Sequence, residues 1–435
     1  FIHFFFSIMF IRQLNSLSED WEDDIYAHSR QPSYRLFKDL DEYLTRYQIE
    51  NSPEFRKNYL FVIEILKAFE MNKFEKIMHF DYDKLNKKLN SLEIFEIFLL
   101  KSVEIERDCF DSLNNLCYLT IIKSNIQRLK ENQFLNLKNL IQLNLRENQI
   151  SYLHPNSFNG LTKLKILNLC QNRLDAISMD HFKNLINLEQ LILSENELTT
   201  LSLDLFRFNE NLEILHLNNN KLTQLSSKLF QTLINLEELD LSSNLITHLE
   251  AHSFAGLTNL QILNLSGNYL DRLVNCQFDQ LKHLNVIYLQ QNKIAYIEAN
   301  AFEGLANLQR LYLTFNLISR LGENQFKHLI SLEELYLSFN LISRMDSQAF
   351  NDLGKLKSLH LSDNQLDILN DSQFKPLVSL EKLYLTWNKI SFINMNAFNN
   401  LNNLIEMDIR VNRLRTVNER EFRSFEALKN CSILF

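Results

Sequence analysis

Two stretches of the chain, LQRLYLTFNLIS at residues 308–319 and LEELYLSFNLIS at residues 332–343, are nearly identical and lie 24 residues apart. In each, the alternation LYL predicts a short strand whose successive side chains point to opposite faces. The leucines then face a core, whereas Tyr336 and Phe339 face solvent. These stretches raise two questions: how far the repeat extends, and why large aromatic side chains occupy an exposed face.

The repeat extends over most of the chain. Leucine opens each unit from Leu92 to Leu428, and each unit reads LxxLxLxxNxLxxLxxxxFxxLxx. Because one unit cannot bury its own leucines, neighbouring units must stack, and their strands must form a parallel sheet. Asparagine recurs every 24 residues at positions 148, 172, 196, 220, 244, 268, 292, 316, 340, 364, 388 and 412. Phenylalanine recurs in the same frame at 110, 134, 158, 182, 206, 230, 254, 278, 302, 326, 350, 374, 398 and 422.

The recurring asparagine and phenylalanine have different expected roles. The asparagine stands where the chain leaves the strand, and we expect its buried amide to satisfy backbone groups of the turn, in a ladder along the stack. The phenylalanine is expected to fill the space under the outer arc as a second apolar spine. Truncating one such ring to alanine should cost about 3–5 kcal/mol.

This pattern resembles the leucine-rich repeat family in its 24-residue typical form, which is common in extracellular proteins such as Toll-like, Slit-like and chaoptin-like proteins. The resemblance covers residues 92–435. It implies an α/β leucine-rich repeat solenoid, a curved right-handed superhelix with a concave parallel β-sheet and irregular convex arcs. It also implies a protein-binding role.

The ends depart from the family pattern. Leu100 and Ser124 stand where the first asparagines are expected, no cysteine precedes Cys109, and the unit that opens at Leu428 is incomplete. Secreted members usually carry cysteine-rich caps, so the sequence suggests an unusual cap or further sequence. An uncovered last strand exposes a sheet edge, from which we expect self-association.

Two segments precede the repeats. Residues 1–11, FIHFFFSIMFI, are too few to span a bilayer and resemble the apolar core of a secretory signal peptide whose start is missing. A buried strand or helix is the alternative. Residues 12–91 do not follow the repeat, and their spacing predicts a helical N-terminal flank or cap. No later segment resembles a membrane span, so membrane anchoring would require sequence that is not present here.

Composition and motifs argue against several classes of function. The net charge is -8 without a long basic run, which disfavours nucleic acid and anionic membranes as partners. None of the 5 cysteines forms a CxxC pair. There is no phosphate-binding glycine loop and no HExxH, and in HLEAH (residues 248–252) the glutamate is misplaced. We therefore expect no enzyme, no catalytic residues, no metal and no cofactor.

Two positions of each unit are predicted to face a partner: the residue between the two leucines of LxL, and the residue before the recurring asparagine. Both are mostly polar in the earlier repeats and mostly aromatic in the later ones. Tyr, Trp and Phe are enriched at the centres of protein interfaces. Stacked rings that merely stabilise the sheet are the alternative. The candidate ligand-binding patch consists of Tyr288, Tyr312, Phe315, Tyr336, Phe339, His360, Asp363, Tyr384 and Trp387.

These observations favour a non-enzymatic protein-recognition module. We expect it to bind a protein or peptide ligand on its concave face, as a secreted protein or part of a receptor ectodomain, outside the cell or at its surface. A structural or cell-adhesion leucine-rich repeat protein and an intracellular scaffold are the alternatives.

Overall fold

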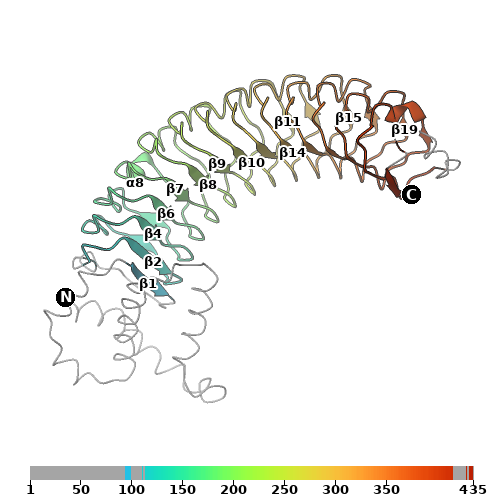
Figure 1. Cartoon of the computed structure of the whole chain (residues 1–435). Helices are drawn as coiled ribbons and strands as arrows, with labels where there is room; N and C mark the ends of the chain where they lie inside the picture. The colour runs from blue at the N-terminus through green and yellow to red at the C-terminus, as the bar shows by residue number, and fades with distance from the viewer. Residues whose placement is uncertain (1–93, 99–109, 111–112, 415–427, 429–430, 435) are drawn as a thin grey trace, which may run out of the picture. The chain divides into compact units, whose positions relative to one another are not determined.

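The computed structural model describes residues 94–98, 110, 113–414, 428 and 431–434 (Figure 1). The predicted apolar segment 1–11 and helical flank 12–91 lie outside the described residues. The chain divides into two compact units, residues 1–166 and 167–435. The described residues of both units are built from the predicted repeat.

In the first unit, three parallel strands are hydrogen-bonded in chain order. They are β1 (Ile94–Phe98), β2 (Tyr118–Ile122) and β4 (Gln142–Asn144). The register places each residue opposite the one 24 positions later, as in the pair Ile94 and Tyr118. A second pair of short parallel strands joins β3 (Arg128–Leu129) to β5 (Tyr152–Leu153). Strand β6 (Ile166–Asn168) lies on the boundary between the units.

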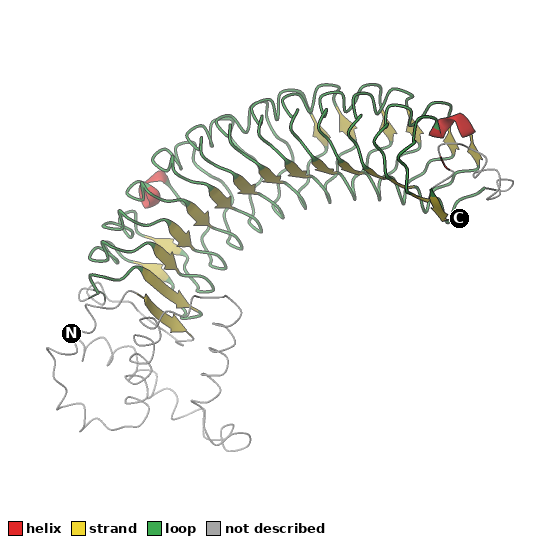
Figure 2. Ribbon diagram, viewed as in Figure 1, coloured by secondary structure: helices red, strands yellow, loops and turns green. Residues whose placement is uncertain are grey.

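In the second unit, the strands again follow chain order, and Figures 1 and 2 show them on the inner side of an arc. Each strand contributes about three residues, because the chain turns away after the second leucine of LxL. The unit contains β7 (Gln190–Ile192), β8 (Ile214–His216), β9 (Glu238–Asp240), β10 (Ile262–Asn264), β12 (Val286–Tyr288), β14 (Arg310–Tyr312), β16 (Glu334–Tyr336), β18 (Ser358–His360), β20 (Lys382–Tyr384), β22 (Glu406–Asp408) and β23 (Ser432–Leu434).

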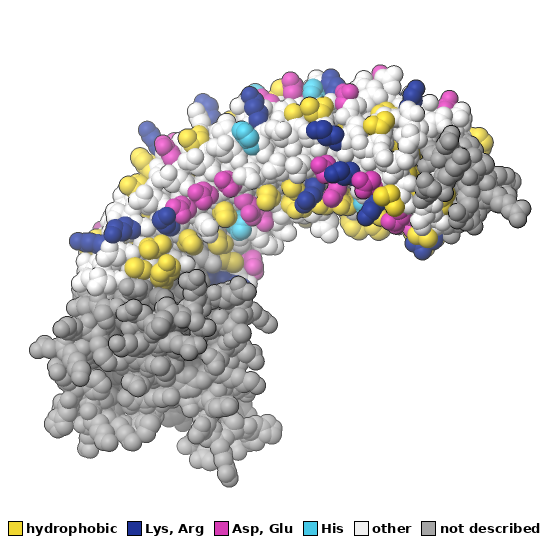
Figure 3. Space-filling model, viewed as in Figure 1, with side chains coloured by type: hydrophobic (Ala, Val, Ile, Leu, Met, Phe, Trp, Pro, Cys, Tyr) yellow, Lys and Arg dark blue, Asp and Glu magenta, His cyan; other side chains and the backbone are white. Residues whose placement is uncertain are grey.

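The outer side of the second unit consists mainly of loops, which confirms the predicted concave sheet and irregular convex arcs. Its helices include α8 (Met179–Phe182) and the single-turn 3-10 helix η2 (Met395–Phe398). Three small parallel ladders were not predicted. They pair β11 (Arg272–Leu273) with β13 (Tyr296–Ile297), β15 (Arg320–Leu321) with β17 (Arg344–Met345), and β19 (Ile368–Leu369) with β21 (Phe392–Ile393). The surface of these loops carries scattered charged side chains (Figure 3).

Leucine and phenylalanine build the core as predicted. The strand leucines, such as Leu311 and Leu335, are 0% exposed. The recurring phenylalanines stack behind them: Phe326 lies 5.9 Å from Phe302 and 6.4 Å from Phe350, measured between ring centroids. Ring contacts run from Phe206 to Phe278 and again from Phe302 to Phe398, so each turn is held by its neighbours rather than by itself.

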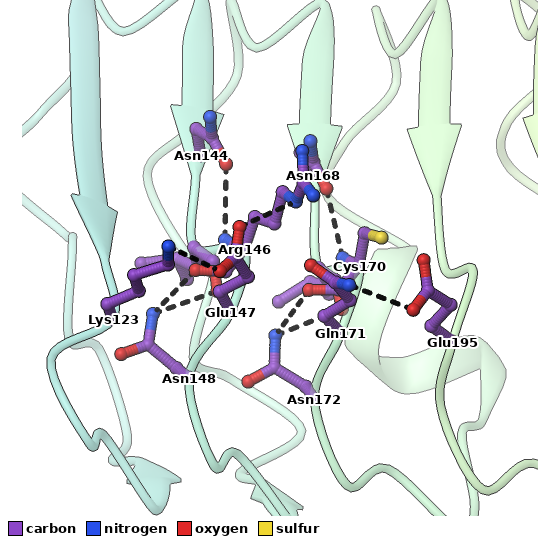
Figure 4. Close-up of polar contacts among 12 residues, drawn as sticks. Lys123, Asn144, Arg146, Glu147, Asn148, Asn168, Cys170, Gln171, Asn172 and Glu195 are labelled. Carbon is purple, nitrogen blue, oxygen red and sulfur yellow. Dashed lines mark hydrogen bonds and ion pairs between the residues drawn. The ribbon is translucent and has the colours of Figure 1, made fainter.

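The predicted asparagine ladder is confirmed in both units. The Nδ2 group of Asn244 donates to the carbonyls of Leu217 and Leu241 at 3.0 Å and of Ser242 at 3.2 Å, and its Oδ1 accepts from Leu222 N at 3.1 Å. Figure 4 shows two other turns, in which the Nδ2 groups of Asn148 and Asn172 donate to carbonyls of their own turn. Ser124 takes the asparagine position in its turn and is buried; its hydroxyl donates to the Ile122 carbonyl at 3.0 Å.

The last repeat departs from the predicted frame. Strand β23 pairs with β22 so that Ile433 lies opposite Met407, a separation of 26 residues rather than 24. The frame that begins at Leu428 is therefore wrong for this strand. A shift of two residues keeps the alternation of side chains, so Cys431 is still buried.

No helix among the described residues has the length and apolar character required to cross a membrane.

Candidate functional site

The site is the inner face of the second unit between β12 and β20. Each strand there presents one side chain between two buried aliphatic residues, as Tyr312 stands between Leu311 and Leu313. Parallel pairing aligns these positions, so Tyr312 is opposite Tyr336, which is in turn opposite His360. The fold therefore converts a 24-residue sequence interval into a row of side chains one strand apart.

Five of the predicted residues form a continuous ring stack: Tyr288, Tyr312, Tyr336, His360 and Tyr384. The successive centroid distances are 4.8, 4.5, 4.3 and 4.5 Å. All four contacts are close to parallel, with interplanar angles of 7–22°. The faces of the inner rings are covered by their neighbours, so a partner would meet ring edges and hydroxyl groups.

Burial favours the neutral forms of two members of the ring stack, Tyr336 and His360. The Tyr336 hydroxyl donates to Glu334 Oε2 at 2.8 Å, and burial together with this bond raises the pKa of Tyr336. Burial lowers the pKa of His360 to about 4, against an opposing effect from Glu334. Its Nε2 lies 2.9 Å from the Ser358 hydroxyl. His360 is therefore a neutral stacking partner at pH 7.

A second row runs beside the ring stack, one residue before each recurring asparagine. We call it the turn row. It includes Phe315, Phe339, Asp363 and Trp387, whose φ angles are +56°, +55°, +53° and +53°. Every member of the row from Glu147 to Val411 has a positive φ in the left-handed region. This conformation suits glycine and asparagine and is costly for bulky side chains.

The turn row is exposed where it is aromatic. Phe315, Phe339 and Trp387 are 50%, 45% and 62% exposed, and the two phenylalanine rings stack at 4.3 Å. Two residues further along the same turns, Leu317 and Leu341 are 45% and 42% exposed. Figure 3 shows hydrophobic side chains interspersed with charged ones along the inner margin of the arc. The nine predicted residues thus fall into two adjacent rows of one surface.

Sequence reasoning missed Leu317 and Leu341, because the repeat pattern treats the residue after the recurring asparagine as variable. The residue type did vary at that position: it is a lysine at 221, 293 and 389 but a leucine at 245, 317 and 341.

The earlier repeats of this unit are polar at the same places. Gln171 in the turn row donates to Glu195 at 2.8 Å (Figure 4), and His216 on β8 lies 2.8 Å from Glu238. The aromatic character is thus confined to the later repeats.

The histidines of HLEAH do not converge. His248 contacts Thr247, and His252 lies 3.2 Å from Asp279. Within the part of the chain that the structure describes, no group of three His, Cys, Asp or Glu side chains could hold a metal ion.

A stack of 24-residue turns with a parallel inner sheet defines a solenoid repeat protein. More specifically, the chain belongs to the leucine-rich repeat family, whose model matches residues 114–169, 162–218, 210–270, 273–318, 306–366, 330–390 and 379–430. Proteins with this fold are generally non-enzymatic protein-interaction modules. A comparison with curated proteins found no match.

Solved structures of similar fold include a leucine-rich repeat protein of Leptospira interrogans, at 26% identity and a TM-score of 0.65, covering 81% of this chain and 92% of that one. Toll, in the Toll–Spatzle complex of Drosophila, matches at 22% identity and a TM-score of 0.58. That match covers 75% of this chain and 48% of the Toll chain, so this chain spans about half the length of the Toll chain. A chain in the octameric complex of Latrophilin 3, Unc5D and FLRT2 matches at 25% identity and a TM-score of 0.52. That match covers 62% of this chain and 83% of the other.

Proposed function

We propose that this chain is a non-enzymatic recognition module that binds a protein or peptide ligand on its inner face, through the ring stack and the aromatic part of the turn row. The observation that carries the proposal is the backbone conformation of the turn row. A left-handed conformation costs roughly 1–2 kcal/mol for a residue with a side chain. Asparagine or glycine would reduce that cost, and the chain has both in this row, at Asn219 and Gly267.

Phe315, Phe339 and Trp387 therefore stand where the backbone conformation alone favours other residues. Strained conformations of this kind persist at binding sites, where the surrounding structure holds them. These side chains are also about half exposed or more, so they contribute less to the core than the spine phenylalanines do. Exposed aromatic side chains grouped in this way are characteristic of interaction surfaces.

The setting we propose is extracellular, in a secreted protein or a receptor ectodomain. The 24-residue repeat resembles a form common in extracellular proteins. Solved proteins of this fold also occur in complexes with protein partners, as in the Toll–Spatzle complex and the complex that contains FLRT2, Latrophilin 3 and Unc5D.

A displayed library of random peptides, selected on the wild-type chain, tests the proposal. Changing Phe315, Phe339 and Trp387 together to asparagine should abolish binding of the selected peptides. The matched control changes Tyr296 and Phe392 to asparagine; both are exposed, at 62% and 58%, on the outer strands β13 and β21. Peptides that bind the inner-face variant and the wild-type chain equally would contradict the proposal.

A further inference from the structure

One acidic side chain, Asp363, lies in the turn row among the aromatic residues. Several carboxylates of the later repeats have a basic partner: Glu333 lies 2.8 Å from Lys357, Asp346 lies 2.8 Å from Arg320, and Asp408 lies 2.6 Å from Arg410. Asp363 has no such partner. Across the residues that the structure describes, its carboxylate forms no hydrogen bond and no ion pair.

The hydrogen-bond ladder between turns places Asp363 directly between two aromatic residues. The Phe339 amide donates to the Ser362 carbonyl at 3.0 Å, and the Asp363 amide donates to the Thr386 carbonyl at 2.9 Å. Successive members of the turn row are thus about one strand spacing apart, roughly 4.8 Å. Phe339 stands on one side of Asp363, and Trp387 stands on the other.

Trp387 differs from the other rings of the surface. Whereas Phe315 covers Phe339, and the tyrosines cover one another, the Trp387 indole stacks on no other described ring. It is 62% exposed. An open indole face attracts cations through its quadrupole, and among aromatic side chains tryptophan does so most strongly.

We propose that Asp363 and Trp387 together bind a cationic side chain, arginine or lysine, of a peptide segment whose apolar residues lie on Phe315 and Phe339. The inference rests on the proposed function and specifies the chemistry of the ligand. A carboxylate without a partner beside an open indole offers both halves of a cation site: an ion pair and a cation–π contact. Burial raises the pKa of Asp363, and a bound cation would favour its charged form.

The spacing also gives the ligand a sequence pattern. Phe339 lies one turn from Asp363 and Phe315 lies two turns away, roughly 5 and 10 Å at the strand spacing. An extended peptide that crosses the strands advances about 3.3 Å per residue. An apolar side chain two or three residues from the cation would therefore lie on the stacked pair Phe315 and Phe339.

Matched synthetic peptides test the cation site. The probe is acetylated Ser-Leu-Ser-X-Ser-Leu-Ser amide, in which X is arginine, its neutral isostere citrulline, or glutamate. The sequence contains 2 tryptophans, so Trp21→Phe makes the fluorescence of Trp387 a specific reporter in the full-length chain. We expect the arginine peptide to bind at least about fivefold more tightly than the citrulline peptide. The glutamate peptide should bind most weakly.

Asp363→Asn supplies the decisive comparison, because asparagine has the same shape and occupies the same row at Asn219 with the same backbone conformation. This variant should bind the arginine peptide and the citrulline peptide equally, with the affinity that the wild-type chain has for the citrulline peptide. Glu195→Gln, in the same row but beside Gln171, is the matched control and should retain the preference for arginine.

Equal affinities for arginine and citrulline in the wild type, or a preference that survives Asp363→Asn, would overturn the cation site. If both peptides bind equally and Phe339→Asn abolishes their binding, the cation site is refuted while the aromatic surface stands. Absence of binding by any peptide at millimolar concentration also refutes the cation site; the library selection tests the proposed function independently.

Discussion

Replacing Phe339 by asparagine separates a binding role from a packing role. The change removes the stack with Phe315, worth about 0.5–1.5 kcal/mol. It also removes the buried part of a ring that is 45% exposed, about half of the roughly 1.5–3 kcal/mol that full burial contributes. Against these losses, asparagine relieves part of the roughly 1–2 kcal/mol cost of a left-handed backbone. The net loss of stability should therefore be about 1 kcal/mol.

A spine residue provides the scale for this prediction. Phe326 is 0% exposed and stacks between two other phenylalanines, so Phe326→Ala should cost about 3–5 kcal/mol. Urea and thermal unfolding of the two variants, measured side by side, decide between the roles. If Phe339→Asn lowers stability as much as Phe326→Ala, the exposed ring is structural packing, and the argument from its backbone conformation fails.

Two further perturbations test the ladder and the ring stack. Asn244→Leu should lower the free energy of unfolding in urea by about 1–3 kcal/mol, because the Leu222 N–H loses its hydrogen-bond acceptor. The carbonyls of Leu217 and Leu241 still accept hydrogen bonds from the side-chain amides of Asn220 and Asn268. Unchanged stability would refute the ladder's role. Lowering the pH from 7 to 4.5 should destabilise the wild type more than His360→Tyr, by about 1–2 kcal/mol after allowance for solvent screening. The pKa of His360 in the folded chain, about 4, lies below its unfolded value of 6.5. At a pH between these two values the unfolded chain binds more protons, so stability decreases as the pH is lowered. Equal pH dependence in the two proteins would show that His360 titrates normally.

Much of the fold could be predicted because the sequence keeps one frame for hundreds of residues. Once the leucines are assigned to the core, the period of two fixes which residues face the other way, and pairing at an interval of 24 aligns them. The row that contains Tyr312 follows from that argument alone. Phe339 has the parity of Leu335 and Leu337 but follows the end of the strand, where a left-handed backbone conformation interrupts the alternation. The burial and hydrogen bonds of the asparagines follow from their position at the end of each strand.

The remaining features depend on local conformation that residue type did not reveal. Phe339 and Trp387 are not typical left-handed residues, so their backbone could have been inferred only from Asn219 and Gly267 in the same row. The shift to 26 residues at β23 was hidden, because a displacement of two preserves the alternation. The open indole beside Asp363 depends on which rings stack, and that needed side-chain positions.

Photo-crosslinking tests the central claim most directly. The photoreactive analogue p-benzoylphenylalanine replaces Phe339 in one protein and Phe392 in another; both are exposed phenylalanines of the second unit, one on the inner face and one on the outer strand β21. Each protein is irradiated with a peptide selected from the displayed library, and the crosslinked product is measured by mass spectrometry. The account predicts crosslinks from position 339 and background from position 392. Equal yields, or a higher yield from position 392, would contradict binding on the inner face.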